Sequence, residues 1–146
     1  MKKKSMLFIM AAVMLLGTSA MAQRVKTVPA PVAAALKSKY PQAIKVTWEK
    51  EKGNFEANWG GRSGEDMSVM FTPTGTFVEQ VEATRPVALP AMANTYIKTH
   101  YAGKKVTEAG KVTDAVGKIT YEAEIKGMEV VFDDKGKFIK AGKEND

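Results

Sequence analysis

The sequence predicts an α+β protein made of two tandem units, each a helix followed by four antiparallel strands. The main observation is an internal repeat: residues 55–59 (FEANW) return as residues 121–125 (YEAEI), 66 positions later. Likewise, residues 67–71 (MSVMF) return as residues 128–132 (MEVVF), 61 positions later. A repeat of this length indicates one supersecondary unit used twice.

A proline-led apolar helix is predicted before each set of strands, over residues 29–40 and 90–101. Proline is tolerated in the first turn of a helix, where its missing N–H would have no partner. Pro41 ends the first helix because proline disfavours helical geometry in the residue before it. The apolar stripes that should face the sheets are Val32, Leu36 and Tyr40, and Ala93, Ile97 and Tyr101.

Strict alternation of apolar and polar residues predicts the strands of the first unit. These strands cover residues 44–49, 55–59, 67–71 and 76–81. Residues 23–28 before the helix are expected to be a short leader. The glycine-rich segment 60–64 joins two antiparallel strands and opens no helix, so it is interpreted as a hairpin loop rather than a phosphate-binding loop.

The second unit repeats the same order after a connection at residues 82–89. Its strands are predicted at residues 106–112, 121–125 and 128–132 and around Phe138. The expected units are residues 23–84 and 85–146. The two sheets could also join edge to edge into one eight-stranded sheet with both helices on one side, which would leave a broad face open to water.

Residues 1–22 are predicted to be a signal peptide. Lys2, Lys3 and Lys4 form a positive region, an apolar run follows, and Ala20-Met21-Ala22 forms a small-residue cleavage site. The apolar run of 11 residues is shorter than the roughly 20 that a membrane-spanning helix needs. The mature chain is therefore expected in the periplasm or outside the cell, with no membrane insertion after cleavage.

Composition limits the possible functions further. Removing the signal peptide leaves 124 of 146 residues and takes away three lysines, so the formal net charge falls from +6 to +3. The remaining lysines are interleaved with glutamates and form no basic stripe, which argues against nucleic-acid binding. The chain has no cysteine, so burial of apolar side chains rather than disulfide bonds must stabilise the fold.

Several segments resemble the PepSY-like family, small exported bacterial proteins classed as β-lactamase-inhibitor-like. The resemblance is carried by the tandem unit, by Tyr40-Pro41, and by residues 46–49 (VTWE) and 53–57 (GNFEA). It covers about residues 28–142 and implies periplasmic localisation and a binding or inhibitory role, with no catalytic residues. The second unit departs from the pattern, because residues 108–110 (EAG) stand where Trp48-Glu49 would recur.

No catalytic, cofactor-binding or metal-binding residues are predicted. His100 is the only histidine and is interpreted as a surface residue. The acidic pair Asp133-Asp134 precedes Lys-Gly and is typical of a β-turn rather than of a calcium loop. Glu56 and Glu122 could serve in acid–base catalysis, but they occupy equivalent positions in separate units and are interpreted as solvated carboxylates.

A partner-binding face is predicted from apolar residues that lie out of phase with the core. Met70 and its counterpart Val131 should point away from the helices, as should Val78 and Ile139. The predicted face contains Glu56, Asn58, Met70, Glu122, Glu124 and Val131. Trp48 and Trp59 share the parity of the core and are expected to be buried.

The functional hypothesis is a non-enzymatic periplasmic binding protein that presents an open sheet face to a protein or peptide of the cell envelope. An inhibitor of an exported hydrolase is the version that the family resemblance favours. The alternative is an envelope protein that binds a small molecule or an ion as a sensor or stress factor. No cofactor is expected.

Overall fold

A computed structural model describes residues 23–143 of the chain and confirms the α+β class, with helices packed on antiparallel strands. The chain divides into two compact units. The N-terminal unit contains residues 23–82 and the segment 113–118, and the C-terminal unit contains residues 83–112 and 119–143. A boundary between the two units at residues 84 and 85 remains a prediction.

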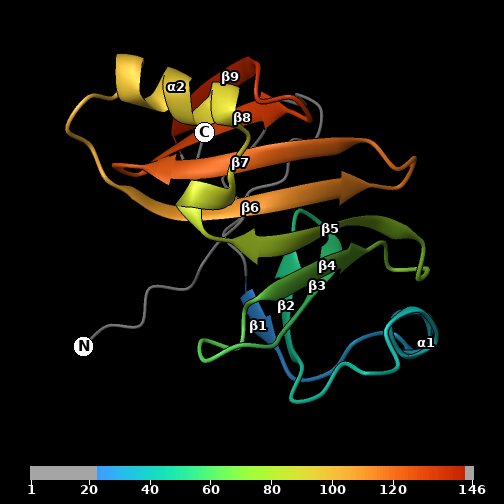
Figure 1. Ribbon diagram of the computed structural model, residues 1–146. Helices are drawn as coiled ribbons and strands as arrows, with labels where there is room; N and C mark the ends of the chain where they lie inside the picture. The colour runs from blue at the N-terminus through green and yellow to red at the C-terminus, as the bar shows by residue number, and fades with distance from the viewer. Residues whose placement is uncertain (1–22, 144–146) are drawn as a thin grey trace. The chain divides into compact units, whose positions relative to one another are not determined.

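The N-terminal unit begins with a strand and a helix and continues as an antiparallel meander (Figure 1). Each strand pairs with the next one along the chain. The elements are β1 (Gln23–Val25), α1 (Ala30–Lys39), β2 (Thr47–Glu51), β3 (Asn54–Trp59), β4 (Met67–Phe71) and β5 (Phe77–Thr84).

The C-terminal unit repeats this order after a turn of 3₁₀-helix, η1 (Pro86–Ala88). Its strands β7, β8 and β9 pair in antiparallel fashion. The elements are α2 (Ala91–His100), β6 (Val106–Asp114), β7 (Ile119–Ile125), β8 (Met128–Asp133) and β9 (Phe138–Lys143).

The start of the first unit differs from the prediction in two respects. The leader contains strand β1, which pairs with β2 so that Arg24 faces Glu49. The next strand begins at Thr47 rather than at residue 44, and Ile44 is 70% exposed. Lys45 has a φ of 54°, and this left-handed conformation interrupts the extended backbone before the strand starts.

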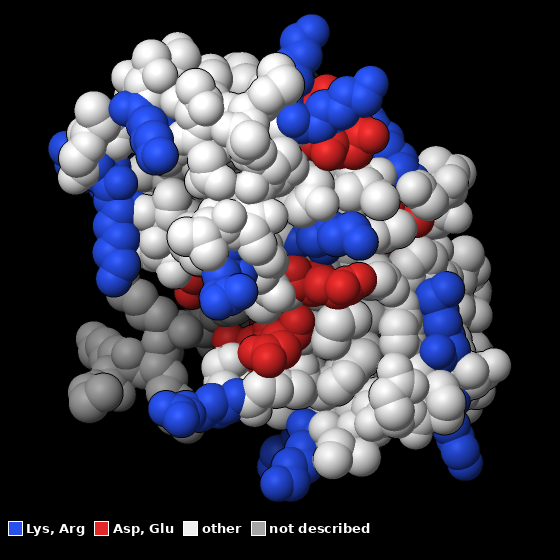
Figure 2. Space-filling model, in the orientation of Figure 1, with Lys and Arg blue, Asp and Glu red and all other residues white. Residues whose placement is uncertain are grey.

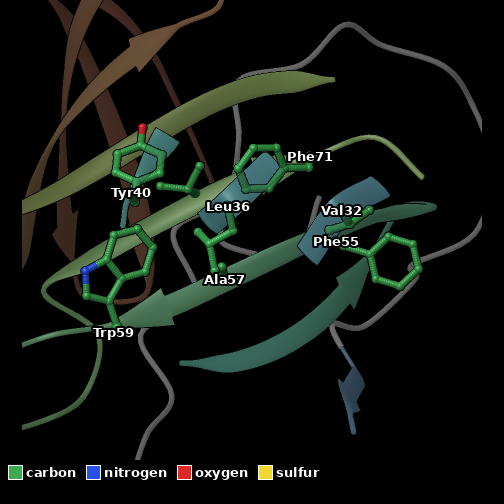
Figure 3. Packing of buried hydrophobic residues seen from close by; sticks show 8 residues of the cluster. Val32, Leu36, Tyr40, Phe55, Ala57, Trp59 and Phe71 are labelled. Atoms are coloured by element: carbon green, nitrogen blue, oxygen red, sulfur yellow. The ribbon is translucent and has the colours of Figure 1, made fainter. Parts of the chain in front are cut away.

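The core of the N-terminal unit lies between α1 and one face of β3 and β4. Val32, Leu36 and Tyr40 come from the helical stretch and lie over the strand residues in Figure 3, as their spacing predicts. The strand residues are Phe55, Ala57, Trp59, Val69 and Phe71. Trp59 is buried and Trp48 packs against the cluster, so both tryptophans are core residues as predicted.

The C-terminal unit has an equivalent core beneath α2. Its buried residues are Leu89, Ala93, Ile97, Ala109, Ala123, Ile125, Val130 and Phe132. Tyr96 adds a stack at the edge, because its ring lies 4.7 Å from Phe138 and 3.9 Å from His100, centroid to centroid. In the first unit, Ala35 stands at the position of Tyr96, and the Nζ of Lys39 lies 4.4 Å from the centroid of the Phe77 ring.

The out-of-phase residues Val78 and Ile139 are explained by a β-bulge that recurs in both units. Met70 pairs with Glu79 and Phe71 with Phe77, so Val78 has no partner on β4. The same shift between β8 and β9 leaves out Ile139. A bulge adds one residue to one strand and reverses the side-chain parity at that point. The β-bulge therefore explains why Val78 and Ile139 are out of phase with the core in both units.

The last strand, β9, is exposed along most of its length. Ile139 to Lys143 are all exposed, and only Phe138 is half-buried. Its pairing partner β8 is buried at three consecutive positions, Val130, Val131 and Phe132. The side chains on β9 include Lys140 and Lys143, so the edge of the C-terminal unit is positively charged.

A glycine turn contacts the first turn of the helix in each unit. The turns between β4 and β5 and between β8 and β9 close with Gly75 N–H donating to the Thr72 carbonyl and Gly136 N–H donating to the Asp133 carbonyl. A Cβ on Gly75 would lie 2.5 Å from the Pro31 carbonyl oxygen, and one on Gly136 would lie 2.7 Å from the Ala93 nitrogen. Both close approaches require glycine.

We expect Gly75→Ala and Gly136→Ala each to destabilise the protein more than Gly117→Ala does. All three glycines have a φ between 82° and 87°, so all three substitutions strain the backbone. Gly117 closes the same kind of turn, with Asp114, but a Cβ there meets no atom within 4 Å. Steric overlap with the helix should add roughly 1–3 kcal/mol, measured by urea unfolding. Equal losses in all three variants would contradict the helix contact.

Candidate functional site: the polar face opposite the helix

The strand face that points away from α1 carries polar side chains in the N-terminal unit. Alternation along β2 places Glu49 and Glu51 on it, and β3 contributes Glu56 and Asn58. The buried polar residues of this unit are Glu49, Glu51, Glu56, Asn58, Ser68 and Glu79, and all of them lie on this face. We call it the carboxylate face.

A single row of directly paired residues crosses the carboxylate face. Arg24 pairs with Glu49, Glu49 with Glu56, Glu56 with Met70, and Met70 with Glu79. Side chains at directly paired positions have Cβ atoms about 5 Å apart, and like charges at such positions repel. The row therefore sets Glu49 and Glu56 against each other, with Arg24 beside Glu49.

The residues of the predicted partner face lie on the strand faces opposite the helices, but they are not open to water. In the N-terminal unit, Glu56, Asn58 and Met70 are 6%, 5% and 3% exposed. In the C-terminal unit, Glu122 and Val131 are 3% and 2% exposed, and Glu124 is half-buried. The expectation of solvated carboxylates at Glu56 and Glu122 is therefore wrong, because the neighbourhood of these side chains excludes solvent.

Burial changes the protonation of Glu56. Loss of solvation, followed by the charges of Glu51 and Glu49 on β2, raises its pKa to about 8. Hydrogen bonds from Asn58 on β3 and Ser68 on β4 act in the opposite direction. Burial also raises the pKa of Glu51, which Lys52 lowers and Glu49 raises. Below about pH 8 the carboxylate face therefore holds a proton.

Amide and hydroxyl groups link β3 to β4 within the face. The Ser68 hydroxyl donates a hydrogen bond to Asn58 Oδ1, and the two residues are directly paired. Thr47 Oγ1 lies 3.5 Å from the Asn58 carbonyl oxygen on the other side. Asn58 is thus fixed in orientation next to Glu56. Ser68 serves as a hydrogen-bond donor here and is not paired with a histidine.

One carboxylate oxygen on this face lacks a hydrogen-bond partner. Glu51 is 5% exposed, and its Oε2 accepts no hydrogen bond within the described part of the chain. A buried polar atom without a partner costs roughly 1–3 kcal/mol, and more when the group is charged. Among residues 23–143, no group of three or more acidic, histidine or cysteine side chains is arranged to hold a metal ion.

The C-terminal unit carries a smaller version of the same face. Glu122 pairs with Val131, as Glu56 pairs with Met70, and Val131 pairs with Lys140 on β9. Glu124 pairs with Glu129, at the positions that Asn58 and Ser68 occupy in the first unit. The predicted partner face therefore consists of two equivalent groups of neighbouring residues, one in each unit.

The remaining candidate groups have structural roles. His100 is exposed, stacks on Tyr96 and lies 3.0 Å from the Tyr96 carbonyl oxygen through Nδ1. Asp133 closes a β-turn, and backbone N–H groups of the turn, first that of Lys137, lower its pKa. In the view of Figure 2, lysine and arginine side chains are scattered and form no stripe.

Sequence reasoning missed Glu49, Glu51 and Ser68 as members of this face. The hairpin between β2 and β3 turns at Lys52 and Gly53, both with positive φ, as a two-residue turn requires. That turn pairs Glu49 with Glu56, so the register could have been found from Lys52-Gly53. The burial of Glu49, Glu51 and Ser68 could not have been found from the sequence, because alternating charges on a strand usually indicate a solvated face.

We expect Glu56→Gln to remove much of the pH dependence of stability between about pH 4.5 and 8. The pKa of Glu56 rises from 4.5 to about 8 on folding, so in this range the folded state binds a proton that the unfolded state releases. The free energy of unfolding of the wild type should then fall with rising pH, by up to about 1.4 kcal/mol per unit.

Urea unfolding of the wild type and Glu56→Gln from pH 5 to 9 measures this slope. Asp134→Asn, at an exposed position, is the matched control and should keep the wild-type slope. A Glu56→Gln profile parallel to the wild type would show that Glu56 is not the group that titrates.

The fold is shared with solved structures of Bacteroides proteins. A protein from Bacteroides eggerthii described as periplasmic has a TM-score of 0.71 at 21% identity, with 80% of this chain and 89% of that chain covered. A DUF2874 family protein from Bacteroides uniformis has a TM-score of 0.71 at 23% identity, with 80% and 90% covered. A BLIP-like protein from Bacteroides fragilis has a TM-score of 0.62 at 17% identity, with 84% and 90% covered.

These similarities establish the fold and not an activity, because every identity is below 25%. The sequence matches no protein-family model and no curated protein. The expected periplasmic localisation agrees with the description of the Bacteroides eggerthii protein. No helix among residues 23–143 has the length and hydrophobicity needed to cross a membrane. The chain therefore shares its fold with Bacteroides proteins of the DUF2874 and BLIP-like kinds.

Proposed function

We propose that this protein is a non-catalytic periplasmic binding protein that engages another protein through the sheet face opposite its helices. In the N-terminal unit the proposed face contains Glu56, Asn58 and Met70. In the C-terminal unit it contains the equivalent Glu122, Glu124 and Val131. The observation that carries the proposal is the recurrence of one pattern, a buried glutamate paired with a buried apolar residue, in both units.

Folding alone does not account for this pattern. Each unit already has an apolar core on the helix side of its strands. The opposite face could therefore carry any polar residues that water solvates. Buried carboxylates instead cost solvation free energy unless they are paired or protonated. A feature that costs stability and recurs in two units is typical of a binding surface.

The composition of the face favours binding over catalysis. In the N-terminal unit it combines carboxylates with an amide, a hydroxyl and the apolar Met70. The Ser68 hydroxyl is bonded to the Asn58 amide oxygen, which is not basic enough to activate a nucleophile. His100 is on the exposed surface of α2.

The comparison with solved structures also supports protein binding. One structure of this fold is described as BLIP-like, and a BLIP-like protein would act by binding another protein. An inhibitor of an exported hydrolase is the finer form of the proposal. Low exposure of the face means that a partner reaches these groups by inserting side chains among them rather than by lying flat on an open sheet.

The test is capture of partners from an envelope fraction with wild-type protein and with the double variant Glu56→Gln and Glu122→Gln. We expect the wild type to retain a partner that the double variant loses. Glutamine keeps the shape of glutamate but cannot ionise, so the variant should fold, which a thermal melt verifies. Asp66→Asn with Asp134→Asn replaces two carboxyl groups at exposed positions and should capture the partner normally.

Equal recovery by all three proteins would show that the face is not the binding surface. Where the captured partner is a hydrolase, its activity is measured with increasing amounts of the protein. Stoichiometric loss of activity identifies an inhibitor. Unchanged activity rejects inhibition and leaves binding as the function.

A further inference from the structure

Three carboxylates gather at the edge of the carboxylate face nearest the N-terminus. Glu49 and Glu51 are two residues apart on β2, so their Cβ atoms are about 7 Å apart on the same side of the strand. Glu56 is directly opposite Glu49 on β3. All three are between 5% and 8% exposed. The charges of Glu49 and Glu51 act on Glu56, and the charge of Glu49 acts on Glu51.

The cluster lacks a positive charge at one defined point. Glu51 Oε2 is buried and accepts no hydrogen bond from the described residues. Its neighbour Lys52 lies in the turn and is exposed, and its charge lowers the pKa of Glu51 without satisfying that atom. A donor that carries positive charge would both satisfy Oε2 and reduce the repulsion between the carboxylates.

A cationic side chain can reach the cluster from solvent, because one already does. The Nε of Arg24 lies 3.7 Å from Glu49 Oε1. The Arg24 side chain is 71% exposed, whereas that of Glu49 is 11% exposed. Arg24 is on β1, which has only three residues and pairs with β2 alone among the described strands. The Arg24 contact therefore shows that a cationic side chain can approach Glu49 beside the edge strand.

A metal ion fits this cluster less well than an organic cation. Within residues 23–143 no three acidic side chains converge as metal ligands, and metal ions need short oxygen contacts from several directions. Ammonium and guanidinium groups carry their donors on a larger frame and tolerate carboxylates several ångströms apart. The whole chain has a formal net charge of +6, so attraction for a cation must come from this local cluster.

We propose that Glu49, Glu51 and Glu56 form a binding site for a lysine or arginine side chain of a protein partner, entered beside Arg24. The inference rests on the proposed function, because it names the chemistry that the partner presents to the carboxylate face. The incoming cation donates to Glu51 Oε2 and lies between the paired carboxylates of Glu49 and Glu56. Its arrival favours the charged form of Glu56, so binding releases a proton and strengthens as the pH rises.

The probe is a ten-residue peptide of alternating glycine and lysine, compared with the same peptide carrying glutamine in place of lysine. Binding is measured by isothermal titration calorimetry at pH 6 and pH 8 in low salt. We expect the lysine peptide to bind the wild type more tightly at pH 8, and the glutamine peptide not to bind.

The double variant Glu49→Gln and Glu51→Gln should bind the lysine peptide at least on the order of tenfold more weakly than the wild type does. These substitutions remove repulsion between like charges, so the variant should melt at or above the wild-type temperature. Asp66→Asn with Asp134→Asn removes two charges from exposed positions and should bind like the wild type. Equal weakening in both double variants would mean general charge attraction and would overturn the proposal.

Calcium chloride alone forms a separate arm. A rise in melting temperature with calcium that is lost in Glu49→Gln with Glu51→Gln would identify a metal site and overturn the proposal. Absence of lysine-peptide binding to the wild type would also overturn it. Partner capture that depends on Glu56 and Glu122 would still support the proposed function in that case, so the two failures are distinguishable.

Discussion

The contact between a glycine turn and the start of a helix fixes the geometry of each unit. Gly75 approaches the Pro31 carbonyl, and Gly136 approaches the Ala93 nitrogen, at distances that leave no room for a side chain. The contact holds the helix over the side of the strands that carries the apolar cluster. Once that side is set, strand alternation assigns every other residue to the core or to the opposite face. Both the apolar clusters and the carboxylate face depend on this choice.

The carboxylate face shows how a small fold can hold chemistry that its own stability does not need. Glu56 is kept neutral by burial and by neighbouring negative charges, and hydrogen bonds from Asn58 and Ser68 oppose that tendency. The group therefore changes between its two protonation states near pH 8. Arg24 neutralises part of the row from the edge strand. A charged group on another molecule would shift the same protonation equilibrium of Glu56.

The repeated segments made most of the fold predictable from the sequence. The repeats located both helices and every strand after β1, and the stripe of Val32, Leu36 and Tyr40 identified the core. Strand β1 was missed because three residues are too few to show alternation. Ile44 was misplaced because the positive φ of Lys45 depends on tertiary structure. Parity placed Glu56, Asn58 and Met70 on the polar face, but their burial could not be predicted, since a local pattern carries no information about what surrounds a strand.

The exposed strand β9 affects how this protein behaves at high concentration. A strand at the limit of a sheet offers unpaired backbone groups to any second chain that approaches it. Lys140 and Lys143 project from this strand, and two copies meeting along it would bring ammonium groups together. The bulge at Ile139 also twists the strand away from a flat, pairable form. Lys140, Lys143 and the bulge at Ile139 therefore discourage the chain from assembling into fibrils.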